Sequence, residues 1–343
     1  MTSKLRFGII GCGVIGHIHA EAIATLPDAQ LVAVVDTVLK PAQKLMEEFH
    51  VKHYGNLQEM LAREHLDIVD ICTPSGQHGE HACQIMRSGV NVIVEKPLEI
   101  TRAAIAEMLR VQQETGVKLA VISQHRFDPD TIKVHDLVEA QAFGRLVQGL
   151  ALVPWWRSQA YYDSGAWRGT WELDGGGVLM NQSIHSIDLL QWLMGPVKSI
   201  FAYTDTLVHR METEDVAVAI LRFANGALGT IAATTDAYPG TGTRIEVHGD
   251  KGSVVIEDDR LSYLHLAQDD REQRAPTAPA GPSAAQNPAT LAIRSHALQI
   301  EDMMRAIREN GAPLVDGYAA RHLVEIILGI YESARTHQEV TLS

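Results

Sequence analysis

The sequence predicts two domains: a parallel, doubly wound α/β domain over residues 1–124, then an α+β domain with a large, mostly antiparallel sheet over residues 125–343. Three observations support this prediction. Short runs of Val, Ile and Leu alternate with amphipathic stretches up to Gln124, as in parallel sheets with crossover helices. Longer strands of alternating polarity follow. The length of 343 residues also favours more than one domain.

The strands of the first domain are expected to be buried on both faces, because they consist almost entirely of apolar residues. Amphipathic stretches between them predict helices. The predicted strands are Leu5–Ile10, Leu31–Val35, Ile68–Ile71, Asn91–Val94 and Lys118–Ile122, and the predicted helices are Pro41–Phe49, Leu57–Arg63, Gly79–Ser88 and Ala103–Glu114.

The second domain is expected to contain longer strands and a few helices. Asn225-Gly226 predicts a tight hairpin, since both residue types accept positive φ. Residues 268–292, rich in Pro and Ala, predict a surface loop. Two helices, Leu291–Asn310 and Gly317–Thr336, close the chain. The predicted strands are Leu146–Val153, Ser199–Thr206, Asp215–Ala224, Ala227–Thr234 and Arg244–His248.

Composition and charge exclude several classes of function. The formal net charge of −13 provides no basic surface for nucleic acid and would repel an anionic membrane. No apolar run reaches transmembrane length, and the chain enters its first strand without the apolar segment of a secretory signal. The three cysteines, Cys12, Cys72 and Cys83, lack metal-ligand spacing. We therefore expect a cytoplasmic protein without a bound metal.

A glycine-rich turn follows the first strand and opens a helix, which is the setting of a dinucleotide-binding loop. Its glycines would let the backbone approach a pyrophosphate at the helix N-terminus. Asp36 ends the second strand, where a carboxylate binds ribose hydroxyls and repels a 2′-phosphate. This residue favours NAD as the cofactor. The nearby Lys40 leaves NADP as an alternative. The alternative is a tight turn without a ligand. The loop residues are Gly11, Gly13, Val14, Ile15 and Gly16.

A second group of candidates ends the following strands, at the edge where this type of sheet binds ligands. Glu95 and Lys96 follow one strand, and Thr73-Pro74 and His78 follow another. We expect all of them to contact the cofactor. An ammonium beside a cationic nicotinamide would lose its proton readily, so Lys96 is also a candidate proton shuttle. A solvated strand-end lysine and an ordinary loop histidine remain the alternatives.

The segment DGGGVLMNQSIHSIDLLQWLMG, residues 174–195, predicts a helix with a polar stripe in an apolar field. Asn181, His185 and Asp188 have i, i+4 and i+7 spacing, which would place them on one helical face. Such a stripe either forms a buried network or binds a ligand. His185 suits proton transfer because imidazole titrates near neutral pH. Asp188 either orients His185 or supports structure.

Aromatic and cationic residues alternate in RSQAYYDSGAWRGTW, residues 157–171. Aromatic planes beside cations suit sugar rings and anionic groups, although ordinary loop packing would produce the same pattern. We select Tyr162, Trp167 and Arg168 as substrate-binding candidates. Arg126, at the boundary between the two predicted domains, is a further candidate, for which a structural salt bridge is the alternative.

Taken together, GIIGCGVIGHIHA, TPSGQH, EKP and GGG…NQSIHSIDLLQWLMG resemble the Gfo/Idh/MocA family, named for glucose-fructose oxidoreductase, inositol dehydrogenase and a rhizopine catabolism protein. The resemblance covers nearly the whole chain. It implies a Rossmann domain that binds a nicotinamide cofactor, and a second domain whose open sheet face is buried in homodimers or homotetramers. It also matches Lys96 to the family's EKP lysine, and Asn181 and His185 to its helical acid–histidine pair.

The resemblance implies hydride transfer between nicotinamide and a secondary carbinol of a sugar or sugar derivative. Asn181 departs from the Asp of many members and cannot exchange a proton, which leaves the proton chemistry to Lys96 and His185. The YY…WRGTW…DGGG pattern is similar to a nucleotide-sugar branch, which suggests a nucleotide-sugar uronate 3-dehydrogenase. An inositol, polyol or dihydrodiol dehydrogenase is the alternative, and a non-catalytic NAD-binding regulator is the alternative of another class.

Overall fold

The computed structural model describes residues 3–269, 273–274 and 293–342, and the chain divides into two compact units. The first unit comprises Met1–Gln124 and Ala292–Arg321, and the second comprises His125–Leu291 and His322–Ser343. The sequence predicts one continuous domain over residues 125–343, whereas contacts in the structure assign residues 292–321 to the first unit. Most of the loop predicted at 268–292 lies outside the described residues.

The first unit contains a parallel six-stranded sheet with the strand order β3-β2-β1-β4-β5-β6. This confirms the predicted doubly wound α/β fold. The order changes direction between β1 and β4, and ligands of such sheets bind at the carboxyl ends of the strands beside this point. The strands are β1 (Leu5–Ile10), β2 (Ala29–Val35), β3 (Lys52–Tyr54), β4 (Ile68–Ile71), β5 (Asn91–Val94) and β6 (Leu119–Val121).

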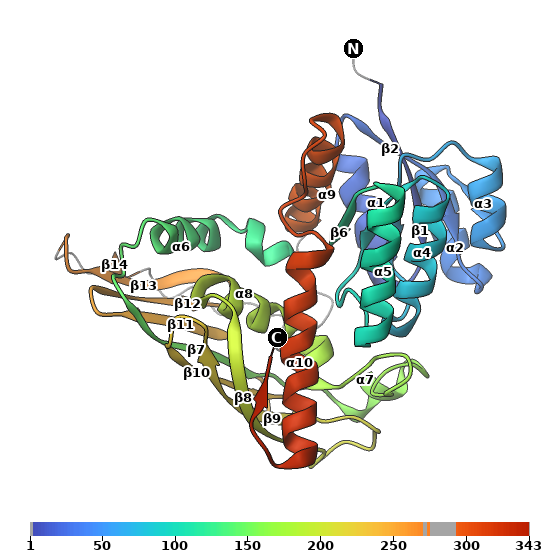
Figure 1. The fold of residues 1–343 in the computed structure, drawn as a ribbon. Helices are drawn as coiled ribbons and strands as arrows, with labels where there is room; N and C mark the ends of the chain where they lie inside the picture. The colour runs from blue at the N-terminus through green and yellow to red at the C-terminus, as the bar shows by residue number, and fades with distance from the viewer. Residues whose placement is uncertain (1–2, 270–272, 275–292, 343) are drawn as a thin grey trace. The chain divides into compact units, whose positions relative to one another are not determined.

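Helices cover the sheet of the first unit (Figure 1). One face packs against α1, α2 and α9 through an apolar core that includes Phe7, Ile9, Ile23, Leu45 and Met303. The distant segment α9 therefore completes this core, which explains its place in the first unit. The helices are α1 (Val14–Thr25), α2 (Leu39–Phe49), α3 (Leu57–Arg63), α4 (His78–Arg87), α5 (Arg102–Thr115) and α9 (Ile293–Arg308).

The second unit contains a sheet of nine strands among the described residues, in the order β14-β13-β12-β11-β7-β10-β9-β8-β15. Its neighbours are antiparallel except for β7 and β10, so the predicted mostly antiparallel sheet is confirmed. The strands are β7 (Leu146–Pro154), β8 (Val197–Asp205), β9 (Val216–Phe223), β10 (Leu228–Thr234), β11 (Arg244–Gly249), β12 (Gly252–Glu257), β13 (Arg260–Leu266), β14 (Gln273–Arg274) and β15 (Val340–Thr341).

The hairpin between β9 and β10 differs from the predicted two-residue turn. Only Gly226 has a positive φ, of 88°, and its N–H bonds to the carbonyl of Phe223. Asn225 instead uses its side chain, which accepts from the N–H of Ala227 and donates to the carbonyl of Met194. The connection is therefore a longer turn closed by one left-handed glycine.

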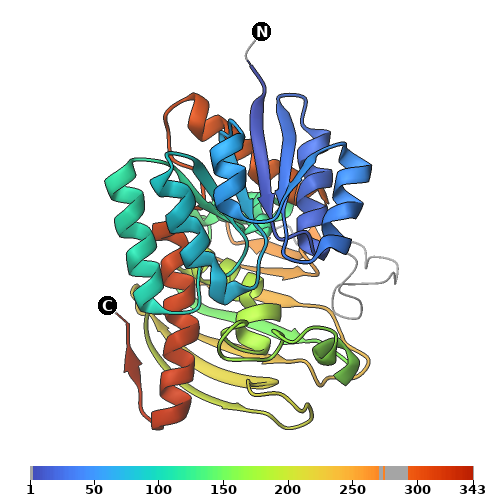
Figure 2. The ribbon, with the colours of Figure 1, turned by 90° about the vertical axis from the view of Figure 1, so that its right-hand side faces the viewer.

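Helices α6 (Pro129–Glu139) and α8 (Ile184–Met194) lie over one face of this sheet (Figure 1). Helix α7 (Gln159–Asp163) is short, and α10 (Gly317–Thr336) runs beside β15 at the sheet edge (Figure 2). The predicted continuous helix through residues 181–188 is wrong, because Val178–Gln182 form a π-helical turn and α8 begins only at Ile184. π-Helical turns occur frequently at functional sites.

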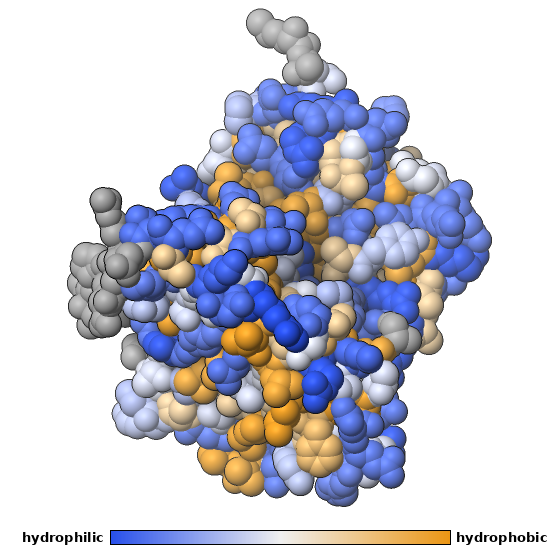
Figure 3. All heavy atoms as spheres, turned by 60° about the vertical axis from the view of Figure 1, so that its left-hand side comes forward, coloured by the Kyte–Doolittle hydropathy of each residue, from blue (hydrophilic) through white to orange (hydrophobic). Residues whose placement is uncertain are grey.

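The opposite face of this sheet carries exposed apolar side chains. Strand pairing places Tyr203, Val218 and Leu152 in one row across neighbouring strands, and Ile220 in the next row. These four side chains are 42–62% exposed. Figure 3 shows a group of apolar residues (orange) in the lower part of that view, over the strands of this unit. Among the described helices, none has the length and apolarity needed to cross a bilayer.

Candidate active site

The glycine-rich loop between β1 and α1 leaves room for a ligand at one glycine only. Gly11 has φ 91°, and a Cβ there would lie 2.4 Å from the carbonyl oxygen of Cys72. A Cβ on Gly16 would lie 2.0 Å from the carbonyl oxygen of Gly11. A Cβ on Gly13, the N-cap of α1, would meet no atom within 4 Å. Two glycines thus allow the turn to close, while Gly13 leaves the space in which a pyrophosphate fits.

Asp36 directly follows β2, which ends at Val35, and its side chain contacts this loop. Its Oδ2 accepts a hydrogen bond of 2.7 Å from the N–H of Cys12, and its Oδ1 accepts one of 2.7 Å from the N–H of Val38. The carboxylate is therefore fixed by two backbone donors, and each oxygen retains a lone pair. This arrangement fits the recognition of ribose hydroxyls by a dinucleotide-binding carboxylate.

His78 contacts the backbone after two neighbouring strands, at Thr73 after β4 and at Pro97 after β5. The ring nitrogens of His78 lie 2.8 Å from the carbonyl oxygen of Pro97 and 2.9 Å from that of Thr73. His78 is 1% exposed, and burial lowers its pKa. Both ring nitrogens therefore face backbone carbonyl oxygens, and the neutral ring donates to one of them at a time. Contact of His78 with the cofactor stays a prediction.

Glu95 and Lys96 follow β5 at the predicted sheet edge. Lys96 is half-buried, whereas Glu95 is 5% exposed. The Oε2 of Glu95 accepts a hydrogen bond of 3.0 Å from the N–H of Lys96, so the acid fixes the backbone of the lysine. The Oε1 of Glu95 lies 3.0 Å from Nε2 of His19. Glu95 is therefore engaged with protein groups at both oxygens.

The buried carboxyl group of Glu214 holds the π-helical turn of the second unit, and the sequence does not predict this role. The oxygens of Glu214 accept hydrogen bonds from the N–H groups of Gly177 and Leu179, at 3.0 and 2.9 Å, and from the hydroxyl of Tyr331 at 2.9 Å. Burial raises the pKa of Glu214 to about 7. Asn181, on this turn, donates to Oδ1 of Asp174 at 2.8 Å.

His185 lies on the first turn of α8 against a second histidine. The rings of His185 and His125 are 5.1 Å apart and meet edge to face. Nδ1 of His125 lies 2.8 Å from Asp128 and 3.4 Å from Asp259. Burial opposes a charge on His125, but the two carboxylates raise its pKa to about 9. A cation therefore stands beside His185 at neutral pH.

Asp188 and Arg126 form a buried salt bridge. Nε of Arg126 donates to Oδ2 of Asp188 at 2.7 Å, and a second bond joins the other guanidinium nitrogen to Oδ1. Both residues are 3% exposed, and the guanidinium lies 5.2 Å from the ring centre of Trp192. Of the alternatives left by the sequence, this geometry favours structural support for both residues.

The aromatic and cationic segment forms a cluster within the second unit. The guanidinium of Arg168 lies 4.4 Å from the ring centres of both Tyr161 and Trp167, and it donates to the hydroxyl of Tyr161 at 2.7 Å. Gln182, on the π-helical turn, donates to the same hydroxyl at 3.2 Å. Tyr162 is buried instead, and its hydroxyl lies 2.9 Å from that of Thr235. The cluster is therefore joined to the turn that bears Asn181.

Both parts of the chain match known families. Residues 5–123 match the "Oxidoreductase family, NAD-binding Rossmann fold", and residues 131–255 match the "GFO/IDH/MocA C-terminal domain". These matches span the glycine loop, Asp36 and Lys96 in one unit, and Asn181 and His185 in the other. The predicted nicotinamide cofactor agrees with the first of these matches.

Named relatives agree with the family. A solved WlbA dehydrogenase from Bordetella pertussis, in complex with NADH and UDP-GlcNAcA, is 34% identical, covers 99% of both chains and has a TM-score of 0.87. Myo-inositol 2-dehydrogenase of Thermotoga maritima is 30% identical over 79% of this chain and 81% of its own. Inositol 2-dehydrogenase of Rhizobium meliloti is 29% identical over 94% and 95%. The chain therefore belongs to the GFO/IDH/MocA family and is an NAD(P)-dependent oxidoreductase that acts on CH–OH groups.

Proposed function

We propose that this enzyme oxidises a ring carbinol of a sugar that carries anionic groups, with a nucleotide-sugar uronate as the substrate class. The observation that carries this proposal is Arg168. Its guanidinium is half-buried between two aromatic rings, and no carboxylate of the described residues lies within salt-bridge distance of it. A positioned guanidinium of this kind suits the bidentate recognition of a carboxylate or phosphate, and the rings suit a sugar face.

The comparisons include relatives of the proposed class and of the polyol class. Two solved WlbA dehydrogenases, 34% and 30% identical over nearly the whole chain, are complexed with NADH and UDP-GlcNAcA. The inositol dehydrogenases match at 29% and 30% identity, so inositol or another polyol is the second candidate. A polyol has no anionic group for Arg168 to bind, and this is the difference that an experiment can use.

In the proposed reaction, the carbinol carbon gives a hydride to C4 of the nicotinamide while its hydroxyl loses a proton, which yields a ketone, NADH and H⁺. Lys96 and His185 are the two groups proposed to handle the proton and the developing carbonyl oxygen, one as base and the other as hydrogen-bond donor. The amide of Asn181, fixed by Asp174, would position substrate without exchanging a proton. The carboxylate of Asp36 supports NAD over NADP as the cofactor.

Substitution of the proton-handling residues tests the catalytic assignment. Lys96→Met or His185→Ala is expected to lower turnover by about a hundredfold or more while NAD binding stays near wild type. Lys118→Met is the matched control, because Lys118 lies in the same unit and its Nζ contacts Asn310 and Gly311 at the surface. Wild-type turnover in both test variants would refute the assignment.

The substrate class is tested by assaying UDP-sugars, UDP-sugar uronates, free hexoses and inositols with NAD and NADP in parallel. The expected result is reaction with the UDP-linked uronate and a preference for NAD. Arg168→Leu should then lower kcat/KM for the uronate by roughly tenfold to a hundredfold, Arg168→Lys by less, and neither should affect a neutral sugar. Reaction of free polyols alone would establish the second candidate instead.

The exposed sheet face supports a homo-oligomer, with a second copy of this chain as its occupant. Side chains such as Val218 and Ile220 are 50% and 57% exposed in a contiguous apolar set, which a stable interface would bury. Sedimentation should find a dimer or tetramer at micromolar concentration. Ile220→Asp should dissociate it, whereas Leu207→Asp, at a more exposed apolar position in the segment after β8, should not. A wild-type monomer would refute this part of the proposal.

A reducing cytoplasm is the proposed location. The three cysteines are free and buried, as expected for thiols that stay reduced in the cell; they are Cys12, Cys72 and Cys83. Fractionation of the source cells should recover the protein with cytoplasmic markers; recovery from a secreted or membrane fraction would contradict the location.

A further inference from the structure

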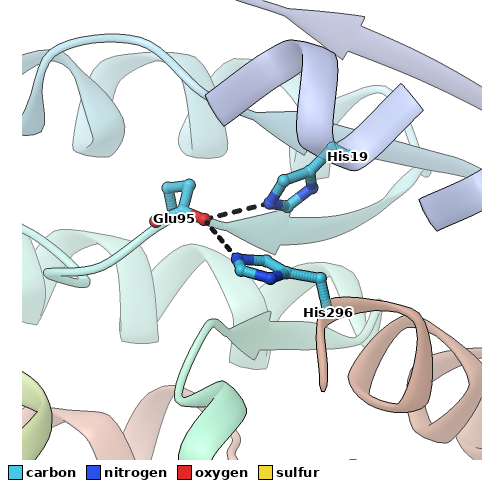
Figure 4. Close-up of side chains that lie close together, drawn as sticks. All are labelled: His19, Glu95 and His296. Atoms are coloured by element: carbon cyan, nitrogen blue, oxygen red, sulfur yellow. Dashed lines mark hydrogen bonds and ion pairs between the residues drawn. The ribbon is translucent and has the colours of Figure 1, made fainter. Parts of the chain in front are cut away.

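Two histidines and two carboxyl groups form a buried cluster in the first unit, and one of its members, Glu95, directly precedes Lys96. His19 lies on α1, Asp70 on β4, Glu95 after β5 and His296 on α9. Nδ1 of His19 lies 2.8 Å from Oδ2 of Asp70, and its Nε2 lies 3.0 Å from Oε1 of Glu95. Nε2 of His296 lies 3.7 Å from the same oxygen, so both histidines converge on it (Figure 4). All four residues are at most 5% exposed.

The charge on His19 depends on the two carboxyl groups beside it. Ionised carboxylates only accept hydrogen bonds, so a ring between two of them donates from both nitrogens and carries a proton at each. Burial raises the pKa of Asp70, while His19 lowers it, so Glu95 is the more firmly ionised partner. Burial opposes the charge on His19, but the nearby Cys72 sulfur and the two carboxylates raise the pKa of His19 well above its usual range. Burial also opposes ionisation of Glu95, and its two histidines lower its pKa well below the usual range. Glu95 is therefore held as an ion-paired carboxylate.

The other oxygen of Glu95 connects this cluster to the proposed catalytic lysine. Oε2 accepts the hydrogen bond of 3.0 Å from the N–H of Lys96. A carboxyl group anchored at one oxygen by histidines and at the other by the Lys96 backbone fixes where the lysine side chain starts. Small displacements of a reacting group cost large factors in rate, so rigid support at this point has kinetic value.

We propose that His296 and His19 are positioning residues that clamp Glu95 and, through it, hold Lys96 in place for proton transfer. This inference rests on the proposed role of Lys96. It also gives α9 a function besides packing, because a helix from the far end of the chain supplies one half of the clamp. His296 lies on the buried side of that helix with Ile300 and Met303, which belong to the apolar core.

The test replaces His296 by leucine, which removes the polar contact with Glu95, and by glutamine, whose amide places a hydrogen-bond donor near that carboxylate. His296→Leu is expected to lower kcat by about tenfold or more while KM for NAD and for the sugar stays within about twofold. His296→Gln should recover most of the loss. Met303→Leu is the matched control, a volume-conserving change at a buried position two turns further along the same helix. If the leucine variant does not fold, His296→Asn, too short to reach Glu95, replaces it.

A double variant separates this inference from the proposed function. If Lys96 is catalytic and the clamp acts through it, Lys96→Met combined with His296→Leu should be no slower than Lys96→Met alone. Wild-type turnover of Lys96→Met would refute the proposed function itself. A strong effect of Lys96→Met together with a wild-type kcat for His296→Leu, or with additive losses in the double variant, would overturn the clamp.

Three of these residues, His19, Glu95 and His296, are also arranged as ligands of a divalent metal would be, and elemental analysis of the purified enzyme decides between the two. The clamp predicts no stoichiometric metal and no loss of turnover after treatment with a chelator. One equivalent of metal, with turnover lost on its removal, would overturn the clamp because His19 and His296 would then be metal ligands.

Discussion

Removal of Asp188 is expected to destabilise the second unit strongly without removing a catalytic group. Asp188→Ala leaves the Arg126 guanidinium buried without its carboxylate. Breaking a buried ion pair from one side costs about 3–5 kcal/mol, because the remaining charge is uncompensated. The contact of the guanidinium with Trp192 is present in both proteins and does not change this difference. The expectation is therefore a loss of about 3–5 kcal/mol in the free energy of unfolding.

The matched control replaces the pair rather than one partner. Arg126→Met with Asp188→Leu fills the same space with apolar groups, and such exchanges are often neutral or stabilising. The double variant should therefore be more stable than Asp188→Ala, although it retains neither charge. If Arg126 bound substrate directly, the double variant would fold but lose substrate affinity. If its role is structural, KM should remain within about threefold of wild type.

Urea unfolding followed by tryptophan fluorescence measures this effect in the relevant part of the chain. All five tryptophans lie between residues 155 and 192, within the second unit, so their emission reports that unit. NAD binding, measured separately, reports the first unit and should not change. A loss below about 1 kcal/mol in Asp188→Ala, or equal losses in the single and double variants, would refute the argument from the buried ion pair.

Three further predictions follow from the geometry. Gly13→Ala should fold normally but weaken NAD binding by about tenfold or more, because its Cβ would fill the open space of the loop, whereas Gly16→Ala should unfold the first unit; equal NAD affinity in Gly13→Ala would contradict the fit. Burial raises the pKa of Glu214 from 4.5 to about 7, so the folded state binds this proton more tightly than the unfolded chain, and the resulting stability is fully present below about pH 4.5 and lost as the pH rises to about 7. Glu214→Gln should remove a decline on the order of 3 kcal/mol between about pH 4.5 and pH 7, as measured by urea unfolding, and an unchanged decline would refute the assignment. His125→Gln removes a cation 5.1 Å from His185, so the acidic limb of the pH–rate profile should move upward by about one unit, and an unmoved limb would exclude this coupling.

The parts of the fold that sequence alone predicts are those specified locally. The bounds of β1, β4 and β5 match the predicted strands because apolar runs of this length between turn residues have few alternatives. The sequence also predicts the glycine loop and Asp36, because their separation along the chain determines how they lie in a βαβ unit. Helix α9 was predicted as a helix, but its apolar stripe does not say which sheet it covers.

The residues that sequence reasoning missed act through long-range contacts. The local sequence gives no signal for Glu214, Tyr331 or His296. Their roles depend on partners that are far away along the chain. The π-helical turn was missed for a related reason. Its backbone is shaped by Glu214, which accepts the N–H groups of Gly177 and Leu179, and helical periodicity cannot register a partner outside the helix.

In each unit a buried carboxyl group supports a predicted functional segment. Glu95 supports Lys96 and Glu214 supports the π-helical turn, but the two carboxyl groups have different partners. Glu95 is paired with His19 and His296, which keep it ionised, so its bond to the Lys96 backbone does not change near neutral pH. Glu214 has a hydroxyl and backbone N–H groups instead, and its pKa of about 7 makes its support of the π-helical turn titrate in that range. A pH dependence of turnover near neutrality should therefore arise in the second unit, while the support of Lys96 remains constant. In physical terms, a carboxylate buried with cations is a fixed support, and one buried with neutral donors is a pH-sensitive one.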